Sequence, residues 1–194
     1  YGKSVLRSSV AFCVACHTRR ESGPQFPLLT AFEKSLQRAS WIERMEFTAG
    51  SRQYDTLLSE VMGKLAGTGT PKISALDLER ASRMALSVLV RVKKDPDRAA
   101  LLAQAMGKSS DATLSMKEAS KVWMKDIREW QDARGKTVVD PMKEAERLAG
   151  GRLSEHAEVR LLRATSILHE LLQKSSEGED AARALYIAGR AYDQ

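Results

Sequence analysis

The sequence predicts an all-α fold, and three observations support this prediction. Apolar residues recur every three or four positions along most of the chain, as they do on one face of an amphipathic helix. N-cap signals precede several of these segments, most clearly at Ser40 and at the two Asp-Pro pairs that begin at Asp95 and Asp140. Segments that alternate apolar and polar residues, which would indicate strands, are almost absent.

Five helices are expected before residue 95. Ser40 with Glu43 forms a capping box, and Ser74 with Asp77 three residues later is a similar start signal. The segment GTGTPK ends the helix before it, because its glycines and Pro71 cannot continue a helix. The expected spans are about 2–13, 28–38, 41–49, 52–66 and 74–94.

Further helices are expected after residue 95. Asp95 and Pro96 restart the chain as N-cap and first helical residue, so we place a domain boundary there, with one domain at 1–94 and a helical extension at 95–194. Ser115 with Glu118 has the pattern of a capping box, and Ser154 is expected to open a later helix. One face of the helix after residue 115 is apolar and suited to packing, and consists of Met116, Ser120, Trp123, Ile127 and Trp130.

Charge and hydropathy favour neither a nucleic-acid partner nor a transmembrane segment. The 31 Lys and Arg residues against 25 Asp and Glu give a net charge of +6, but the basic residues are spread along helices beside acidic ones, as on solvated faces. No basic tract contains interleaved aromatic residues, so nucleic acid is not an expected partner. No apolar run approaches the roughly 20 residues of a transmembrane helix.

The strongest chemical signal is the motif Cys13-x-x-Cys16-His17, which contains both cysteines of the chain. Side chains at positions i and i+3 share one helix face, so both thiols can reach one planar group. This motif is the attachment signature of c-type haem, in which the thiols form thioethers and His17 is the proximal iron ligand. A redox-active dithiol, a disulfide and half of a zinc site remain the alternatives, although the only other histidines are His156 and His169.

From Tyr1 to about Lys94 the chain resembles a class I cytochrome c. The expected first helix runs into the haem motif, Gly23 and Pro24 follow His17, and TPKISALDLERASRMALSVL is similar to the family's closing helix. The resemblance implies one covalently attached haem c, with the Pro24 carbonyl accepting a hydrogen bond from the His17 ring. Phe26 is expected to line the haem pocket, because it lies in the segment that follows the motif.

The sixth iron ligand is where the sequence departs from that family. The family usually has a methionine shortly before the closing helix, and Thr68 stands at about that position here. Met62 is the first candidate for the distal ligand and Met45 the second. A histidine of the extension, His156 or His169, could take this position instead, or the iron could be open or water-bound. The structural interpretations are core packing for both methionines, a buried or flanking His169 and an exposed His156.

These observations predict a mono-haem c-type cytochrome that transfers single electrons, as a subunit or docking partner of a larger redox complex. It is not expected to be an enzyme, and peroxidase-type activity would require an open sixth position. The resemblance implies a periplasmic or otherwise extracytoplasmic location in a bacterium. The alternative is a helical scaffold subunit with a structural or sensing haem, because about half of the chain, residues 95–194, is an added helical extension. Helical hairpins are expected there, and ALYIAGRAY near the end is a partial match to a tetratricopeptide helix without a second copy.

Overall fold

The computed structural model describes residues 37–68, 72–136, 138–150, 155–174 and 177–192, and every regular element in this part of the chain is a helix. The predicted all-α class is therefore confirmed there, and the first two expected helices lie wholly or mostly outside it. The elements are α3 (Trp41–Gly50), α4 (Tyr54–Leu65), α5 (Ala75–Ser87), the π-helix η1 (Val88–Val92), α6 (Pro96–Lys108), α7 (Leu114–Asp132), α8 (Pro141–Ala149), α9 (Glu158–Lys174) and α10 (Glu179–Tyr192).

Several of the predicted helix starts are confirmed. The Ser40 hydroxyl accepts from the Glu43 N–H at 3.4 Å while the Glu43 carboxylate accepts from the Ser40 N–H at 2.8 Å, which is a complete capping box. The carboxylate of Asp95 accepts from the N–H groups of Asp97 and Arg98, and that of Asp140 accepts from the Lys143 N–H at 3.0 Å. Local side-chain acceptors therefore set where these helices begin.

The start of α7 differs from the prediction. The cap is Thr113 rather than Ser115, because the Thr113 hydroxyl accepts a hydrogen bond from the Met116 N–H at 3.2 Å. Ser115 is instead an exposed residue inside the first turn. The predicted apolar face of α7 is confirmed, since Met116, Trp123 and Ile127 are completely buried. The start signal expected at Ser154 lies outside the described residues.

The helix expected to reach Lys94 changes its winding before it ends. After Ser87 the chain forms a π-helical turn, in which the Lys93 N–H donates to the Val88 carbonyl five residues back at 2.9 Å. Lys94 then adopts a left-handed backbone conformation with φ +49°, and Asp95 starts α6. The apolar side chains at the start of this turn are buried, because η1 lies against α5, α6 and α9.

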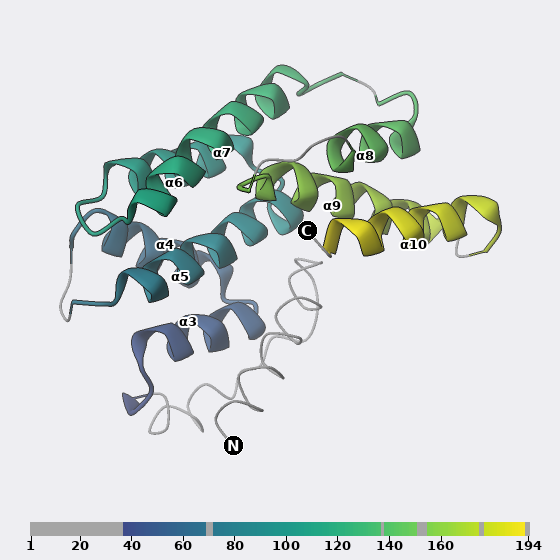
Figure 1. The fold of residues 1–194 in the computed structure, drawn as a ribbon. Coiled ribbons are helices and arrows are strands. Elements are labelled where there is room, and N and C mark those ends of the chain that lie inside the picture. The colour runs from purple at the N-terminus through teal and green to yellow at the C-terminus, as the bar shows by residue number, and fades with distance from the viewer. Residues whose placement is uncertain (1–36, 69–71, 137, 151–154, 175–176, 193–194) are drawn as a thin grey trace.

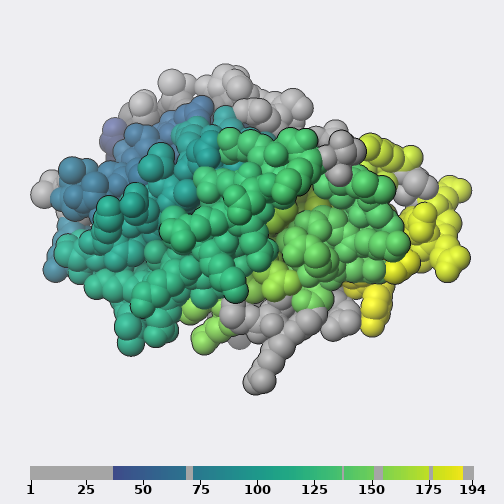
Figure 2. Space-filling model, turned by 90° about the horizontal axis from the view of Figure 1, so that it is seen from above, coloured from purple at the N-terminus to yellow at the C-terminus, as the bar shows by residue number. Residues whose placement is uncertain are grey.

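The helices form three groups (Figure 1). α3, α4 and α5 pack together, α6 and α7 form an antiparallel hairpin beside them, and α8, α9 and α10 form a three-helix group on the other side. In the space-filling view, α10 occupies one end of the molecule (Figure 2). Within the described ranges, no helix combines the length and the low polarity needed to cross a membrane.

One hydrophobic core joins the first two groups. It contains buried residues from α3 through α7 and also Val159 from the start of α9, so apolar packing is continuous across Asp95. A second, smaller cluster lies within the three-helix group and consists of Ala145, Leu168, Ala184, Ile187 and Ala188. The domain boundary at residue 95 stays a prediction.

The α6–α7 hairpin is closely packed at Gly107. A Cβ atom added there would lie 2.6 Å from the Ser120 hydroxyl oxygen, which donates a hydrogen bond to the Ala103 carbonyl at 2.7 Å. Glycine in a helix normally costs about 1 kcal/mol relative to alanine, so close packing explains its presence here.

We therefore expect Gly107→Ala to lower the free energy of unfolding by about 1–3 kcal/mol, because the added methyl group overpacks the contact. In a Ser120→Ala background, the same substitution should be neutral or stabilising, because the clashing oxygen is gone. Urea unfolding of the four variants measures this coupling. Equal effects of Gly107→Ala in both backgrounds would contradict the contact.

Candidate functional site

The residues of the predicted haem-attachment site lie outside the described part of the chain. This applies to Cys13, Cys16 and His17, and to the expected supporting residues Pro24 and Phe26. Their roles therefore stay predictions. The two methionines considered as distal ligands are described, and their surroundings can be compared directly.

Met45 belongs to the hydrophobic core. It lies in the middle of α3, and its side chain is only 3% exposed. Trp41 is one turn earlier on the same helix face and is also buried. A thioether in this position fills core volume, which agrees with the structural interpretation of Met45.

Met62 lies in the last turn of α4 and is only partly buried, at the edge of the same core. Its backbone carbonyl accepts the ordinary helical hydrogen bond from the Ala66 N–H, and α4 ends three residues later at Leu65. The thioether of Met62 is therefore less enclosed than that of Met45.

Thr68, at the position where cytochromes of the resembled family carry a methionine, closes the end of α4. Its N–H donates to the Gly63 carbonyl at 2.9 Å, and its hydroxyl donates to the same carbonyl at 2.7 Å. Gly67 precedes it with φ +74°, and its N–H donates to the Lys64 carbonyl, which completes a Schellman motif. Thr68 thus belongs to the motif that closes the C-terminus of α4, two residues after the C-cap Ala66.

The two ends of α3 carry buried hydrogen-bond donors that lack a partner within the described residues. These donors are the indole N–H of Trp41 and the Nε and Nη1 groups of Arg52. Arg52 also adopts a left-handed backbone conformation with φ 62°, which is uncommon for a residue other than glycine. Because buried donors without acceptors are costly, these groups are suited to an acceptor that the described residues do not supply.

The two remaining histidines have different surroundings. His156 precedes α9 and is 7% exposed, so the expectation of an exposed side chain is wrong. The chain turns inward here because the neighbouring Ala157 and Val159 are both buried. The Nδ1 atom of His156 has no hydrogen-bond partner within the described ranges. His169 is partly buried on α9, as expected.

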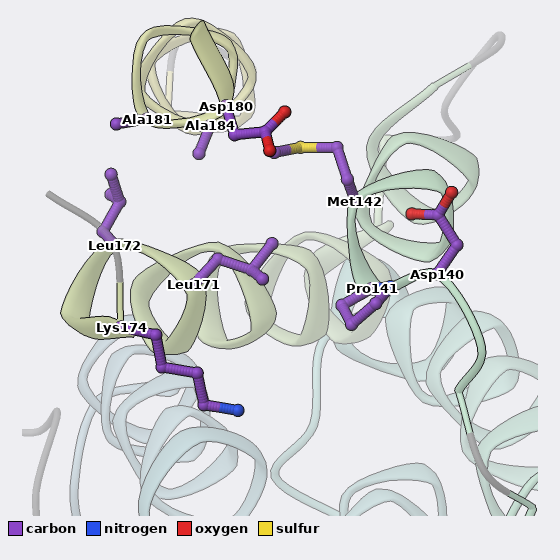
Figure 3. A pocket seen from close by; sticks show the side chains of 9 residues that line it. All are labelled: Asp140, Pro141, Met142, Leu171, Leu172, Lys174, Asp180, Ala181 and Ala184. Atoms are coloured by element: carbon purple, nitrogen blue, oxygen red, sulfur yellow. The ribbon is translucent and has the colours of Figure 1, made fainter. Parts of the chain in front are cut away.

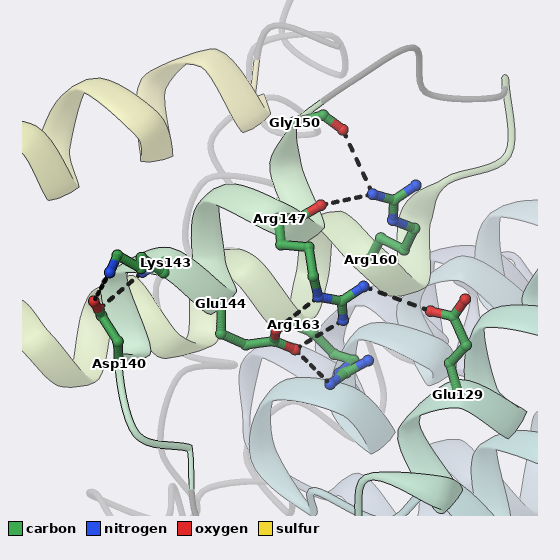
Figure 4. A network of polar contacts seen from close by, with 8 residues as sticks. All are labelled: Glu129, Asp140, Lys143, Glu144, Arg147, Gly150, Arg160 and Arg163. Atoms are coloured by element: carbon green, nitrogen blue, oxygen red, sulfur yellow. Dashed lines mark hydrogen bonds and ion pairs between the residues drawn. The ribbon is translucent and has the colours of Figure 1, made fainter.

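A charged network connects α7, α8 and α9 (Figure 4). The Arg147 guanidinium donates to the Glu144 carboxylate at 2.7 Å and 3.0 Å, and Arg163 approaches the same carboxylate at 3.5 Å. The hydrogen bond from Arg147 is the main cause that lowers the pKa of Glu144. Arg163 also lies over the Trp130 ring, 5.6 Å from its centroid. This network fixes α8 on α9.

Asp126, on α7 near this network, is a buried carboxyl group. It is 6% exposed, and its Oδ2 atom has no hydrogen-bond partner among the described residues. Burial raises the pKa of Asp126, while the positive charge of Arg160 opposes the shift. Since the folded state binds this proton more tightly than the unfolded state, stability falls as pH rises from about 3.8 through the raised pKa.

Asp126→Asn is expected to stabilise the protein at pH 7, because it removes a poorly solvated buried charge. The advantage over the wild type should shrink as the pH falls below the unfolded pKa, where the carboxyl group is protonated in both states. Urea unfolding across this pH range measures the difference. Glu118→Gln, on the same helix but exposed, is the control, and an equal gain from both variants would contradict the burial argument.

A cavity of about 240 Å³ lies between α8, α9 and α10 (Figure 3). Its walls are mainly apolar, and the charged side chains of Asp140, Lys174 and Asp180 lie at its margin. The Asp140 carboxylate is already engaged as a helix cap, and the backbone hydrogen bond from Lys143 lowers its pKa. The described residues that line the cavity include no histidine, cysteine or serine.

The described residues contain no group of three His, Cys, Asp or Glu side chains suited to hold a metal ion. Comparison with known proteins adds no further constraint, since no family model, curated protein or solved structure matches the chain. A proposal for the function therefore rests on the motif Cys13-x-x-Cys16-His17 and on the surroundings of the described residues.

Proposed function

We propose that this protein is a mono-haem c-type cytochrome that transfers one electron at a time. The observation that carries the proposal is Cys13-x-x-Cys16-His17, because two thiols and an imidazole at this spacing are the donor set of covalent haem attachment. Bound haem supplies the redox chemistry. The chain would hold it through Cys13 and Cys16, bind the iron through His17 and orient that ring through Pro24.

The described residues fit this assignment in two respects. Met62 offers a partly exposed thioether, so we retain it as the first candidate for the distal ligand and Met45 as the second. The unpartnered donors of Trp41 and Arg52 are suited to anionic acceptors, and the propionates of a haem have that chemistry. Trp41 begins α3, which carries Met45, and Arg52 follows its C-terminal end.

We further propose that the protein works outside the cytoplasm, docked to a larger redox complex and not as an enzyme. Covalent attachment of c-type haem, as the family resemblance implies, takes place in that compartment. The alternative is a scaffold subunit in which the haem is structural or acts as a sensor. It is favoured by the exposed apolar residues Leu185 and Tyr186 on α10, at one end of the molecule.

The absorption spectrum of the purified protein in both oxidation states tests the electron-transfer proposal. A low-spin spectrum with a charge-transfer band at the red end in the oxidised form would support methionine ligation. That band should disappear in Met62→Ala and persist in Met45→Ala. A high-spin spectrum that changes on addition of CO would favour the sensing alternative, and a spectrum without haem bands would contradict both.

A further inference from the structure

One side of α7 carries a row of exposed cations. The other side of this helix is buried against α6 and α9, and the α6–α7 hairpin lies along one edge of the fold (Figure 1). The members of the row stand at positions i, i+4, i+8 and i+11, so the helical period gathers them on one side. This cationic row consists of the exposed residues Lys117, Lys121, Lys125 and Arg128.

The cationic row has no direct acidic contact within the part of the chain that the structure describes. None of its four side chains forms an ion pair or a hydrogen bond there. Cations nearby do find acids within the fold, since Arg134 pairs with Asp97 at 2.8 Å and Arg147 pairs with Glu144 at 2.7 Å. The row is therefore a surface whose positive charge is left open to a partner.

The spacing of the cationic row is unfavourable for a helix without a partner. Lys121 has one lysine a turn before it and another a turn after it, and like charges at positions i and i+4 destabilise a helix. A solvated helix face usually alternates charges of both signs. An acidic surface brought against the row would replace this repulsion by attraction, and it would also be steered towards it by the net charge of +6.

We propose that the cationic row of α7 docks an acidic face of a protein partner. A partner helix with carboxylates at positions i, i+4, i+8 and i+11 carries the matching pattern of negative charge. This docking surface is independent of haem attachment, because all four cations belong to α7 and none of them is a proposed haem ligand.

The residues around the row favour a protein over a uniformly anionic surface. Glu118 and Asp132 are exposed near the two ends of the row. A bilayer or a nucleic-acid duplex would also face these two carboxylates, whereas a protein can place its acids opposite the cations alone. The tryptophans of α7 lie outside the row, Trp123 being completely buried and Trp130 lying against Arg163. The row therefore has no aromatic side chain that could stack on a nucleic-acid base.

NMR titration of the ¹⁵N-labelled full chain with a designed acidic peptide tests the proposal. The peptide is an alanine-rich helix with glutamates at positions i, i+4, i+8 and i+11. At low salt it is expected to bind saturably, with the largest shift changes at backbone amides of α7, and added salt should weaken the binding by screening. A peptide of the same composition with its glutamates spread around the helix is the control and should bind about fivefold more weakly.

A charge reversal within the row tests which residues bind the peptide. Lys121→Glu should weaken the binding by about tenfold, because one attractive pair becomes repulsive. The helix should remain folded, since the new glutamate has a lysine on either side, and circular dichroism checks this. Lys72→Glu changes the net charge equally and is the matched control, because Lys72 is exposed and precedes α5. It should change the binding by less than about twofold.

Three results would overturn the proposal. The first is that the row-matched peptide does not bind at low salt. The second is that Lys121→Glu and Lys72→Glu lose the same amount of binding. The third is that phosphatidylglycerol vesicles or duplex DNA bind at least as tightly as the peptide and shift the same α7 amides, which would assign the row to a membrane or a nucleic acid instead.

Discussion

Replacing Cys13 and Cys16 together by serine is expected to remove all covalently bound haem. Each thioether forms when a thiol adds across one vinyl group of the porphyrin, and a serine hydroxyl does not replace the thiol in that reaction. Intact-mass measurement under denaturing conditions should therefore show the wild-type chain with the added mass of one haem and the double variant with none. The absorption bands of the purified protein should be lost in parallel.

The single variants Cys13→Ser and Cys16→Ser are the matched controls, because each keeps one attachment point and His17. They should retain part of the covalent haem, whereas the double variant retains none. A wild-type mass equal to that of the unmodified polypeptide would contradict the proposal. A mass that corresponds to an internal disulfide would favour the structural alternative for the two cysteines.

The largest loss of stability from a single side chain is expected for Trp123→Ala. Trp123 is completely buried in α7, and its indole N–H donates to the Glu158 carboxylate on α9 at 2.7 Å. Glu158 also forms an ion pair with Arg83 on α5. The Glu158 carboxylate therefore connects α9 to both α7 and α5. Removal of the ring leaves a cavity and deprives a carboxylate of a donor, and large-to-small changes of this kind cost about 3–5 kcal/mol.

Urea unfolding followed by circular dichroism measures this loss. Trp123→Phe separates the two contributions, because it keeps most of the buried ring and removes the hydrogen bond to Glu158. It should therefore cost less than Trp123→Ala. Leu114→Ala on the same helix is the control, since Leu114 is 74% exposed and should change stability by less than about 0.5 kcal/mol. A loss of similar size in both alanine variants would contradict the assigned role of Trp123.

Much of the helical pattern could be predicted because the signals are local. Ser40, Asp95 and Asp140 each satisfy backbone N–H groups within three residues, so the sequence around them contains both partners of the hydrogen bond. The α7 start shows the limit of this reasoning. Thr113 and Ser115 are both capable caps, and the structure begins the helix two residues earlier than predicted, with the Thr113 hydroxyl accepting from the Met116 N–H.

Features that depend on distant helices could not be predicted in the same way. The segment after Ser87 has the composition of an ordinary helix, yet it forms a π-helical turn where α5, α6 and α9 meet around it. His156 stands in a polar stretch of sequence but is buried at the start of α9. In both cases the conformation follows from packing partners that lie far away in the chain.

The candidate site also has one part that local sequence signals predict and one part that depends on packing. The attachment motif is readable from Cys13, Cys16 and His17 because the thiols and the imidazole lie within five positions. The distal ligand has no local signal, since Met45 and Met62 have the same side chain on neighbouring helices. Their difference is one of burial, and only the packing of α3 and α4 shows that Met45 is enclosed in the core.

By itself the sequence determined the helical class and several of the helix starts, and it supplied the motif on which the proposed haem attachment rests. Each of these depends on groups separated by a few positions, where backbone geometry fixes the distances. The tertiary structure decided the burial of Met45, Asp126 and His156, the contacts of Trp123 and the exposed outer face of α10. Burial and exposure depend on how helices meet, because the solvent around one side chain is displaced by residues from elsewhere in the chain.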